Sequence, residues 1–348
     1  MASKRCFGIF FFLLFLIIIG VTIICIIAKD GIKHQETYPF WQRTIVYQVY
    51  PRSFCDHDGD GTGDLQGILS KADYLKELGV GTVWLSPIFS SPMADFGYDV
   101  SNFTAVEPLF GTMDDFDALR AALHDRGEPA AGVGLRAEPS SDEHEWFVKS
   151  RRREEPYTDY YIWADPKGFD EAGQPIPPNN WLSVFRGSAW AWAEERQQFY
   201  FHQFLAKQPD LNYRNQRVRE EMMQVLRFWL DRGADGFRVD AVKFLFEVED
   251  INQNESIAID PETDDPLDYY YLNHTLTINQ PETLEVVREW RDILDQYSDR
   301  VMIGNEGTID DDIASGDELL RQRQRFPLER LSPFNFLLID RFHNRKRL

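Results

Sequence analysis

Two apolar segments of the sequence carry charged residues that could do chemistry. GFRVDAV (236–242) contains Arg238 and Asp240, and VMIGNEG (301–307) contains Glu306. A charge inside a buried strand is costly unless it is paired or used. Two carboxylates at neighbouring strand ends suit glycoside hydrolysis, in which one attacks the anomeric carbon and the other protonates the leaving oxygen, about 5–5.5 Å apart in a retaining enzyme. Arg238 would then keep Asp240 ionised. The alternative is an internal Arg–Asp salt bridge without a catalytic role.

A second candidate site is the acidic loop that runs from Asp56 to Asp64. Carboxylates at positions 1, 3, 5 and 9 with glycine at position 6 follow the spacing of a calcium loop, although the usual glutamate at position 12 is missing. Four carboxylates within nine residues would repel one another without a cation. We therefore expect a structural Ca²⁺ whose ligands are Asp56, Asp58, Asp60 and Asp64. The alternative is a solvated acidic turn.

Alternating strand-like and helix-like segments must position these residues. Several helical segments end in glycine just before a short apolar stretch, which is the βα repeat of a parallel sheet. Strands are expected at 44–54, 81–89, 236–242, 301–307 and 333–340, and helices at 64–79, 113–127, 215–233 and 282–299.

The repeated βα pattern predicts an α/β fold, namely a (β/α)8 TIM barrel, rather than a doubly wound sheet, for which no glycine-rich dinucleotide fingerprint is found. Active sites of such barrels lie at the C-terminal ends of the strands, where Arg238, Asp240 and Glu306 are expected. Residues 140–205 have no clear helical period and are expected to form a subdomain inserted after the third strand.

The first thirty residues bear on the cellular compartment. Residues 6–28 are apolar and long enough to cross a bilayer, and Lys4 and Arg5 precede them, which predicts a cytoplasmic N-terminus. A cleaved signal peptide is the alternative, but no Ala-x-Ala site follows. We expect a single-pass type II plasma-membrane protein with a tail at 1–5, a transmembrane anchor at 6–28, a linker at 29–41 and a partial barrel at 42–348.

Charge and glycosylation sequons are consistent with this placement. The net charge is 37 − 57 = −20, which argues against a nucleic-acid partner because phosphate binding needs a basic face. Three Asn-x-Ser/Thr sequons, at Asn102, Asn254 and Asn273, predict glycosylation of an extracellular or luminal region.

Eight segments together resemble a known family. They are VYQVYPRSF, DHDGDGTGDLQGI, ADFGYDV, YTDYYIW, PPNNWLSV, YFHQF, QPDLNYRN and GADGFRVDAVKFL. Residues from about 40 to 307 are similar to the α-amylase superfamily, glycoside hydrolase family 13, and QPDLN resembles its α-glucosidase branch. The resemblance implies retaining hydrolysis of the α-glucosidic bonds of maltose-type oligosaccharides. The resemblance also implies that Asp240 is the nucleophile and Glu306 the acid/base. It implies that Arg238, Asp95 and Tyr98 form the glucose-binding group.

The same segments, with the apolar N-terminus, also resemble the rBAT-like heavy chains of amino-acid exchangers. The resemblance implies an escort role for a transporter light chain without catalysis. Such heavy chains join their partner through a cysteine just outside the membrane, but residues 29–41 contain none and Cys55 lies in the first barrel loop. Arg238 beside Asp240 favours the enzyme. Three possibilities therefore stay open, namely the enzyme, the transporter heavy chain and an inactive truncated or frame-shifted gene product.

The chain departs from the family pattern in three places. Where the family has a segment like Asp-Phe-Val-Pro-Asn-His, this chain has Gly134–Pro139. These six residues can be encoded as GGA CTT CGT GCC GAA CCA C, and reading the same bases without the first one restores the family segment. A weaker case of the same kind involves Leu319–Arg321. The family's third acidic residue and last strands would follow Leu348, so we expect a truncated barrel with open edges that folds poorly or is inactive as written. Sequencing the cDNA across residues 128–140 would test the frame shift.

Overall fold

The computed structural model describes residues 45–127, 132–136, 140–298, 300–304 and 331–333. The chain divides into two units, Met1–Arg43 and Thr44–Leu348, and all described residues belong to the second. The expected anchor at 6–28 lies outside the described residues. Within the described part of the chain, no helix is long and apolar enough to cross a membrane.

A parallel sheet forms the centre of the second unit. Among the described residues it has six strands in the order β1-β2-β5-β11-β14-β15. Every neighbouring pair is parallel, and Asp240 at the end of β11 lies opposite Arg136 of β5. The strands are β1 (Val46–Val49), β2 (Thr82–Leu85), β5 (Gly132–Arg136), β11 (Gly236–Asp240), β14 (Val301–Gly304) and β15 (Leu331–Pro333).

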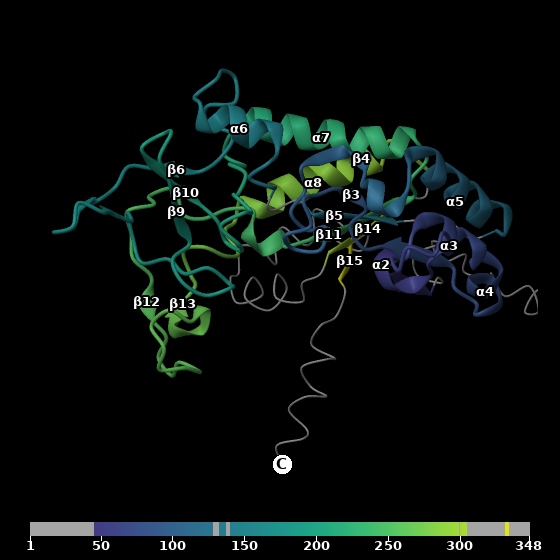
Figure 1. Ribbon diagram of the computed structural model, residues 1–348, viewed down its shortest axis with the longest axis horizontal. Coiled ribbons are helices and arrows are strands. Elements are labelled where there is room, and N and C mark those ends of the chain that lie inside the picture. The colour runs from purple at the N-terminus through teal and green to yellow at the C-terminus, as the bar shows by residue number, and fades with distance from the viewer. Residues whose placement is uncertain (1–44, 128–131, 137–139, 299, 305–330, 334–348) are drawn as a thin grey trace, which may run out of the picture. The chain divides into compact units, whose positions relative to one another are not determined.

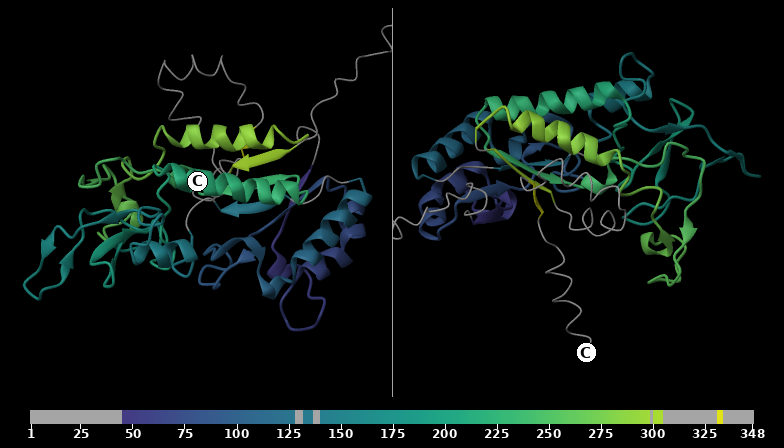
Figure 2. Two further views of the ribbon diagram at one scale, coloured as in Figure 1. Left: turned by 90° about the horizontal axis from the view of Figure 1, so that it is seen from above. Right: turned by 180° about the vertical axis from the view of Figure 1, so that it is seen from behind.

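Helices connect these strands and cover the sheet. α7 and α8 run side by side along it in all three views (Figures 1 and 2). The buried residues of α7 recur at helical spacing, from Val218 through Met222 and Val225 to Trp229, so one face of this helix joins the core. The helices between successive strands are α3 (Leu65–Ser70), α4 (Ala72–Glu77), α5 (Met113–Asp125), α7 (Gln216–Asp231) and α8 (Thr283–Leu294).

Several predicted boundaries need correction. The first predicted strand, 44–54, ends at Val49, and α2 (Pro51–Phe54) follows because proline suits the first turn of a helix. The predicted helix 64–79 is divided at Lys71, where the Ser70 hydroxyl donates to the Gly67 carbonyl and competes with the helical pattern.

The segment between β5 and α7 forms a small sheet of its own, β6-β10-β9, beside the parallel sheet (Figure 1). A separate hydrophobic cluster built on Trp181, Trp190 and Phe201 stabilises it. Such a subdomain is what the lack of helical period in 140–205 predicts. Its elements are α6 (Glu145–Arg151), β6 (Trp163–Ala164), β7 (Gly168–Phe169), β8 (Pro175–Ile176), β9 (Trp190–Ala193) and β10 (Gln198–Phe201).

Short elements occupy the remaining connections. β3 pairs with β4 after β2, and β12 pairs with β13 in the connection between β11 and α8. These elements are β3 (Phe89–Ser90), β4 (Asn102–Val106), η2 (Pro108–Phe110), η3 (Val242–Phe244), β12 (Ser256–Ile257), η4 (Tyr269–Tyr271) and β13 (Leu272–Asn273).

Candidate active site

The charged pair of β11 lies inside the sheet core. The Arg238 guanidinium is 2.8 Å from an Asp240 carboxylate oxygen, and the two side chains are only 11% and 17% exposed. Arg238 also lies over the ring of Trp84 on β2, 5.0 Å from its centroid. β5 lies between β2 and β11 in the sheet, so this contact joins two strands that are not neighbours. The internal salt bridge that was the alternative interpretation is therefore present, and it lies at the C-terminal end of a strand of the parallel sheet.

The backbone after Asp240 turns sharply. Ala241 has φ 59° and ψ 27°, a left-handed conformation that is unusual for a residue with a Cβ. Its N–H donates to an Asp240 carboxylate oxygen at 3.0 Å. Strained residues of this kind persist where their surroundings fix them, often at functional sites. The turn and Arg238 together fix the position of the Asp240 carboxylate.

The loop after β2 carries the predicted sugar-binding residues Asp95 and Tyr98, both half-buried. A fully buried carboxylate, Asp99, organises this loop by accepting from the N–H groups of Ala94 and Asp95 and from the Ser91 hydroxyl, at 2.8–3.0 Å. Asp99 lies within the ADFGYDV segment but was not among the site residues predicted from the sequence.

Three loops meet around Asp95. Gln208, fully buried in the QPDLN segment, donates its amide N–H to Asp95 at 2.9 Å. The N–H of Ser141, after β5, donates to the Val100 carbonyl at 2.8 Å, and the N–H of Asp142 donates to the Lys207 carbonyl at 2.9 Å. Loops that follow different strands are thereby joined at the same edge of the sheet. Gln208, the glutamine of the QPDLN segment, therefore holds Asp95 in place, a role that the sequence alone did not predict.

Glu306 lies outside the described residues. β14, which leads to it, ends at Gly304 and pairs with β11 so that Gly304 lies opposite Val239. The three sequon asparagines, Asn102, Asn254 and Asn273, are all exposed.

The acidic loop after α2 brings three of its four aspartates together. Ligand atoms of Asp56, Asp58 and Asp64 lie within 4.8 Å of one another. The Asp60 carboxylate is not in this group and accepts the Thr62 N–H at 2.7 Å. Backbone hydrogen bonds, first from Gly59 and then from Gly61, lower the pKa of Asp56 and keep it ionised. Three carboxylates that offer oxygen ligands at this spacing fit a hard cation such as Ca²⁺.

Comparison with known proteins decides the family. Residues 48–344 match the model described as "Alpha amylase, catalytic domain". The chain belongs to the α-amylase family. The fold of that family's catalytic domain is a (β/α)8 barrel, and the parallel β1-β2-β5-β11-β14-β15 sheet is the part of it that the described residues form.

Relatives of this α-amylase family member include enzymes and a transport subunit. It is 50% identical to a salivary alpha-glucosidase of Anopheles gambiae and to Maltase A2 of Drosophila melanogaster, with 77% and 74% of the chain aligned and 45% and 46% of those proteins covered. It is 43% identical to the rat amino acid transporter heavy chain SLC3A1 over 81% of the chain and 40% of that protein. The chain spans about half the length of these relatives.

Solved structures agree with the fold. The α-glucosyl transfer enzyme XgtA superimposes with a TM-score of 0.73 at 42% identity, over 80% of this chain and 52% of that one. Trehalose-6-phosphate hydrolase of Bacillus licheniformis superimposes with a TM-score of 0.68 at 34% identity, over 80% and 48%.

Proposed function

We propose that the protein, when its full-length reading frame is intact, is a retaining α-glucosidase that acts on maltose-type oligosaccharides. The observation that carries the proposal is the Arg238–Asp240 pair at the end of β11, held by the left-handed turn at Ala241. The similarity to an alpha-glucosidase and a maltase at 50% identity supports it.

In the proposed reaction Asp240 attacks the anomeric carbon while Glu306 gives a proton to the leaving oxygen. Water, deprotonated by Glu306, then releases the sugar from Asp240, so two displacements return the α configuration. Arg238 would orient the attacking carboxylate. Asp95, held by Gln208, and Tyr98 would bind hydroxyl groups of the glucosyl unit.

The experiment compares full-length protein with two variants in the hydrolysis of maltose. Asp240→Asn should lower kcat by about 10⁴-fold or more, because an amide does not form the glycosyl intermediate at a useful rate. Glu306→Gln should lower it by about 10²–10⁴-fold. Asp260→Asn, which changes an exposed aspartate in the same way, should have no effect. Full activity of Asp240→Asn, or release of the β anomer, would overturn the proposal.

Further parts of the proposal concern cofactor and location. Asp56, Asp58 and Asp64 would hold a structural Ca²⁺ that cross-links the first loop, and Asp60 would complete the set only after its side chain turns. Residues 6–28 would anchor the protein in the plasma membrane lipid as a type II protein with the barrel outside. Glycans at the exposed Asn102, Asn254 and Asn273 would accord with that side.

The second candidate function is that of a heavy chain that escorts an amino-acid transporter light chain. The 43% identity to the rat transporter heavy chain favours it. If the full-length protein hydrolyses no α-glucoside yet raises surface delivery of an exchanger, this second function replaces the first. Asp240→Asn should then leave transport unchanged.

A further inference from the structure

The QPDLNYRN segment contacts two loops of the candidate active site, one through each end. Its first residue, Gln208, donates to the Asp95 carboxylate at 2.9 Å. Its seventh residue, Arg214, donates through Nη2 to the backbone carbonyl of Glu247. Glu247 belongs to the connection that follows Asp240, the last residue of β11. One short segment therefore touches both the loop that carries a sugar-binding carboxylate and the loop that follows the proposed nucleophile.

Backbone hydrogen bonds to the inserted subdomain hold this segment in place. The N–H of Asp210 donates to the Phe201 carbonyl of β10 at 3.1 Å, and the N–H of Asn212 donates to the Tyr160 carbonyl at 2.8 Å. Asn215, the N-cap of α7, ends the segment. The segment is thus fixed along its length, which makes it a firm support for the side chains at its two ends.

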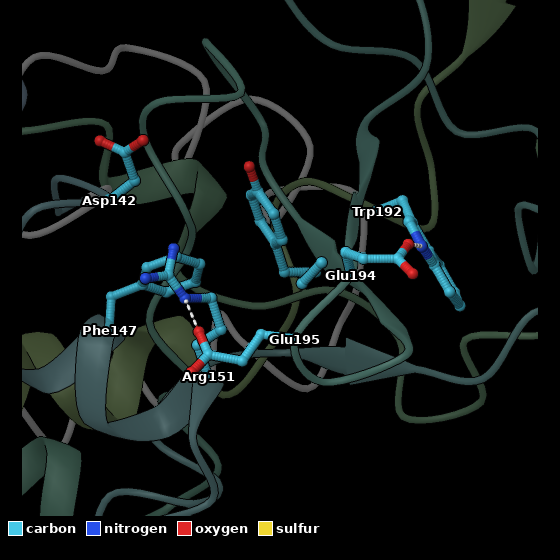
Figure 3. Close-up of a pocket in the computed structure, with 8 residues that line it drawn as sticks. Asp142, Phe147, Arg151, Trp192, Glu194 and Glu195 are labelled. Atoms are coloured by element: carbon cyan, nitrogen blue, oxygen red, sulfur yellow. Dashed lines mark hydrogen bonds and ion pairs between the residues drawn. The ribbon is translucent and has the colours of Figure 1, made fainter.

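The subdomain that supports the segment is itself cross-linked. At the cavity of about 410 Å³ between α6 and the β9–β10 hairpin, Arg151 of α6 pairs with Glu195 at 2.9 Å (Figure 3). Arg152 also pairs with Glu195, at 3.4 Å. The rings of Phe147 on α6 and Trp163 on β6 are stacked. These contacts join α6 to the small sheet β6-β10-β9, so the segment is attached to a packed unit.

The Arg214 guanidinium joins the loop after β11 to the start of α8. Besides its bond to the Glu247 carbonyl, it donates through Nη1 to Glu282, the N-cap of α8, at 2.8 Å. It also lies over the buried ring of Phe246, 5.3 Å from the centroid. The buried Glu247 carboxylate is 4.0 Å from Nε of the same group. A planar guanidinium with several donors can make these contacts together.

The loop after β11 has little freedom between Asp240 and Glu247. Glu247 follows Asp240 by seven positions, through the left-handed turn at Ala241 and the helical turn η3. The N–H of Val248 donates to the Leu276 carbonyl at 2.8 Å, which fixes the loop directly after Glu247. A displacement of Glu247 therefore shifts the backbone that carries the Asp240 carboxylate. In enzymes, misplacement of a reacting group by about 1 Å can cost about 10²-fold in rate.

We propose that Arg214 is a positioning residue of the candidate active site, which fixes the loop after β11 and thereby holds the Asp240 carboxylate in place for its attack on the anomeric carbon. This role rests on the proposed glycosidase function. Gln208 holds Asp95 through a separate hydrogen bond. Loss of Arg214 should therefore impair the attack on the sugar more than the binding of the sugar.

Steady-state hydrolysis of maltose by the full-length protein and its variants tests the proposal. Arg214→Met, which keeps the apolar stem, should lower kcat by about 10–100-fold while KM changes by less than about threefold. Glu282→Gln keeps an acceptor for Nη1 and should retain kcat within about threefold. Arg219→Met is the matched control, because Arg219 joins α7 to Glu289 of α8 at 3.0 Å without contacting the loop after β11, and it should leave kcat unchanged.

Hydrogen exchange measures the loop itself, independently of activity. The amide N–H groups of Phe244 and Val248 are hydrogen-bonded to backbone carbonyls, so they are protected in the parent protein. They should exchange at least about tenfold faster in Arg214→Met and at the parent rate in Arg219→Met. If Arg214→Met does not fold, Arg214→Lys replaces it. Its kcat should fall by at least about threefold, because one nitrogen cannot occupy the positions of both Nη1 and Nη2.

Several results would overturn the role of Arg214. They are an unchanged kcat in the Arg214 variant, a KM that rises as much as kcat falls, or an equal loss of kcat in Glu282→Gln or Arg219→Met. Failure of the proposed glycosidase looks different, because the parent protein would then hydrolyse no maltose. In that case hydrogen exchange alone decides: faster exchange at Phe244 and Val248 supports Arg214 as the residue that fixes this loop, and unchanged exchange overturns it.

Discussion

The contribution of the Arg238–Asp240 pair to the free energy of unfolding depends on its burial. At 11% and 17% exposure the two charges are largely removed from water, and each compensates the other. Arg238→Ala should destabilise the fold by about 1–3 kcal/mol, because it leaves a buried carboxylate without its charged partner. In the double variant with Asp240→Asn the loss should be smaller than the sum of the two single losses. Denaturant unfolding of all four proteins measures this coupling, and strictly additive losses would contradict it.

A second residue-scale prediction concerns His144, the N-cap of α6. Burial lowers the pKa of His144 to about 4 from its ordinary value of 6.5. The unfolded chain therefore binds more protons between pH 6.5 and 4, so this contribution to stability is complete above pH 6.5 and is lost as the pH falls toward 4.

His144→Asn isolates that effect. Asparagine also accepts the Trp146 N–H that His144 caps, but it does not titrate. The free energy of unfolding of the variant should fall less steeply from pH 6.5 to 4 than that of the parent protein. If the free energy of unfolding of His144→Asn falls with pH as steeply as that of the parent protein, burial of His144 is not the cause of the pH dependence.

At the scale of elements, the close approach of β11 and β14 positions the site. A Cβ on Gly236 would lie 2.0 Å from the Val301 carbonyl oxygen, so alanine forces the two backbones apart. Gly236→Ala should destabilise the protein by about 1–3 kcal/mol. It should also lower activity, since Asp240 ends the same strand. Gly168→Ala, where nothing lies within 4 Å, is the control and should cost no more than about 0.5 kcal/mol. Equal melting temperatures for both variants would contradict the prediction.

The βα order of the elements could be predicted because each helix ends before a short apolar strand, as at Gly233 before β11. The breaks inside elements could not, because they depend on local bonds such as that from the Ser70 hydroxyl to Gly67. In the site, Asp240 and Arg238 were found because charges in an apolar strand are rare. Asp99 and Gln208 were missed as functional residues, since their roles depend on contacts between loops distant in sequence.

At the scale of the whole molecule, the proposed anchor at residues 6–28 predicts the side of the membrane on which the barrel is expected to lie. Lys4 and Arg5 predict that residues after about 29 face outward, and the exposed Asn102 and Asn273 are then open to the glycosylation machinery. Protein from eukaryotic cells should therefore move faster on a gel after N-glycosidase treatment. Asn102→Gln should reduce that shift and Asn102→Gln with Asn273→Gln should reduce it further, whereas Asn252→Gln, at an exposed asparagine outside any sequon, should not.

Alkaline carbonate should leave the protein in the membrane pellet, since an apolar span of 23 residues holds a chain far more firmly than surface contacts. An unglycosylated protein with its N-terminus outside would place the barrel in the cytoplasm and reverse the topology.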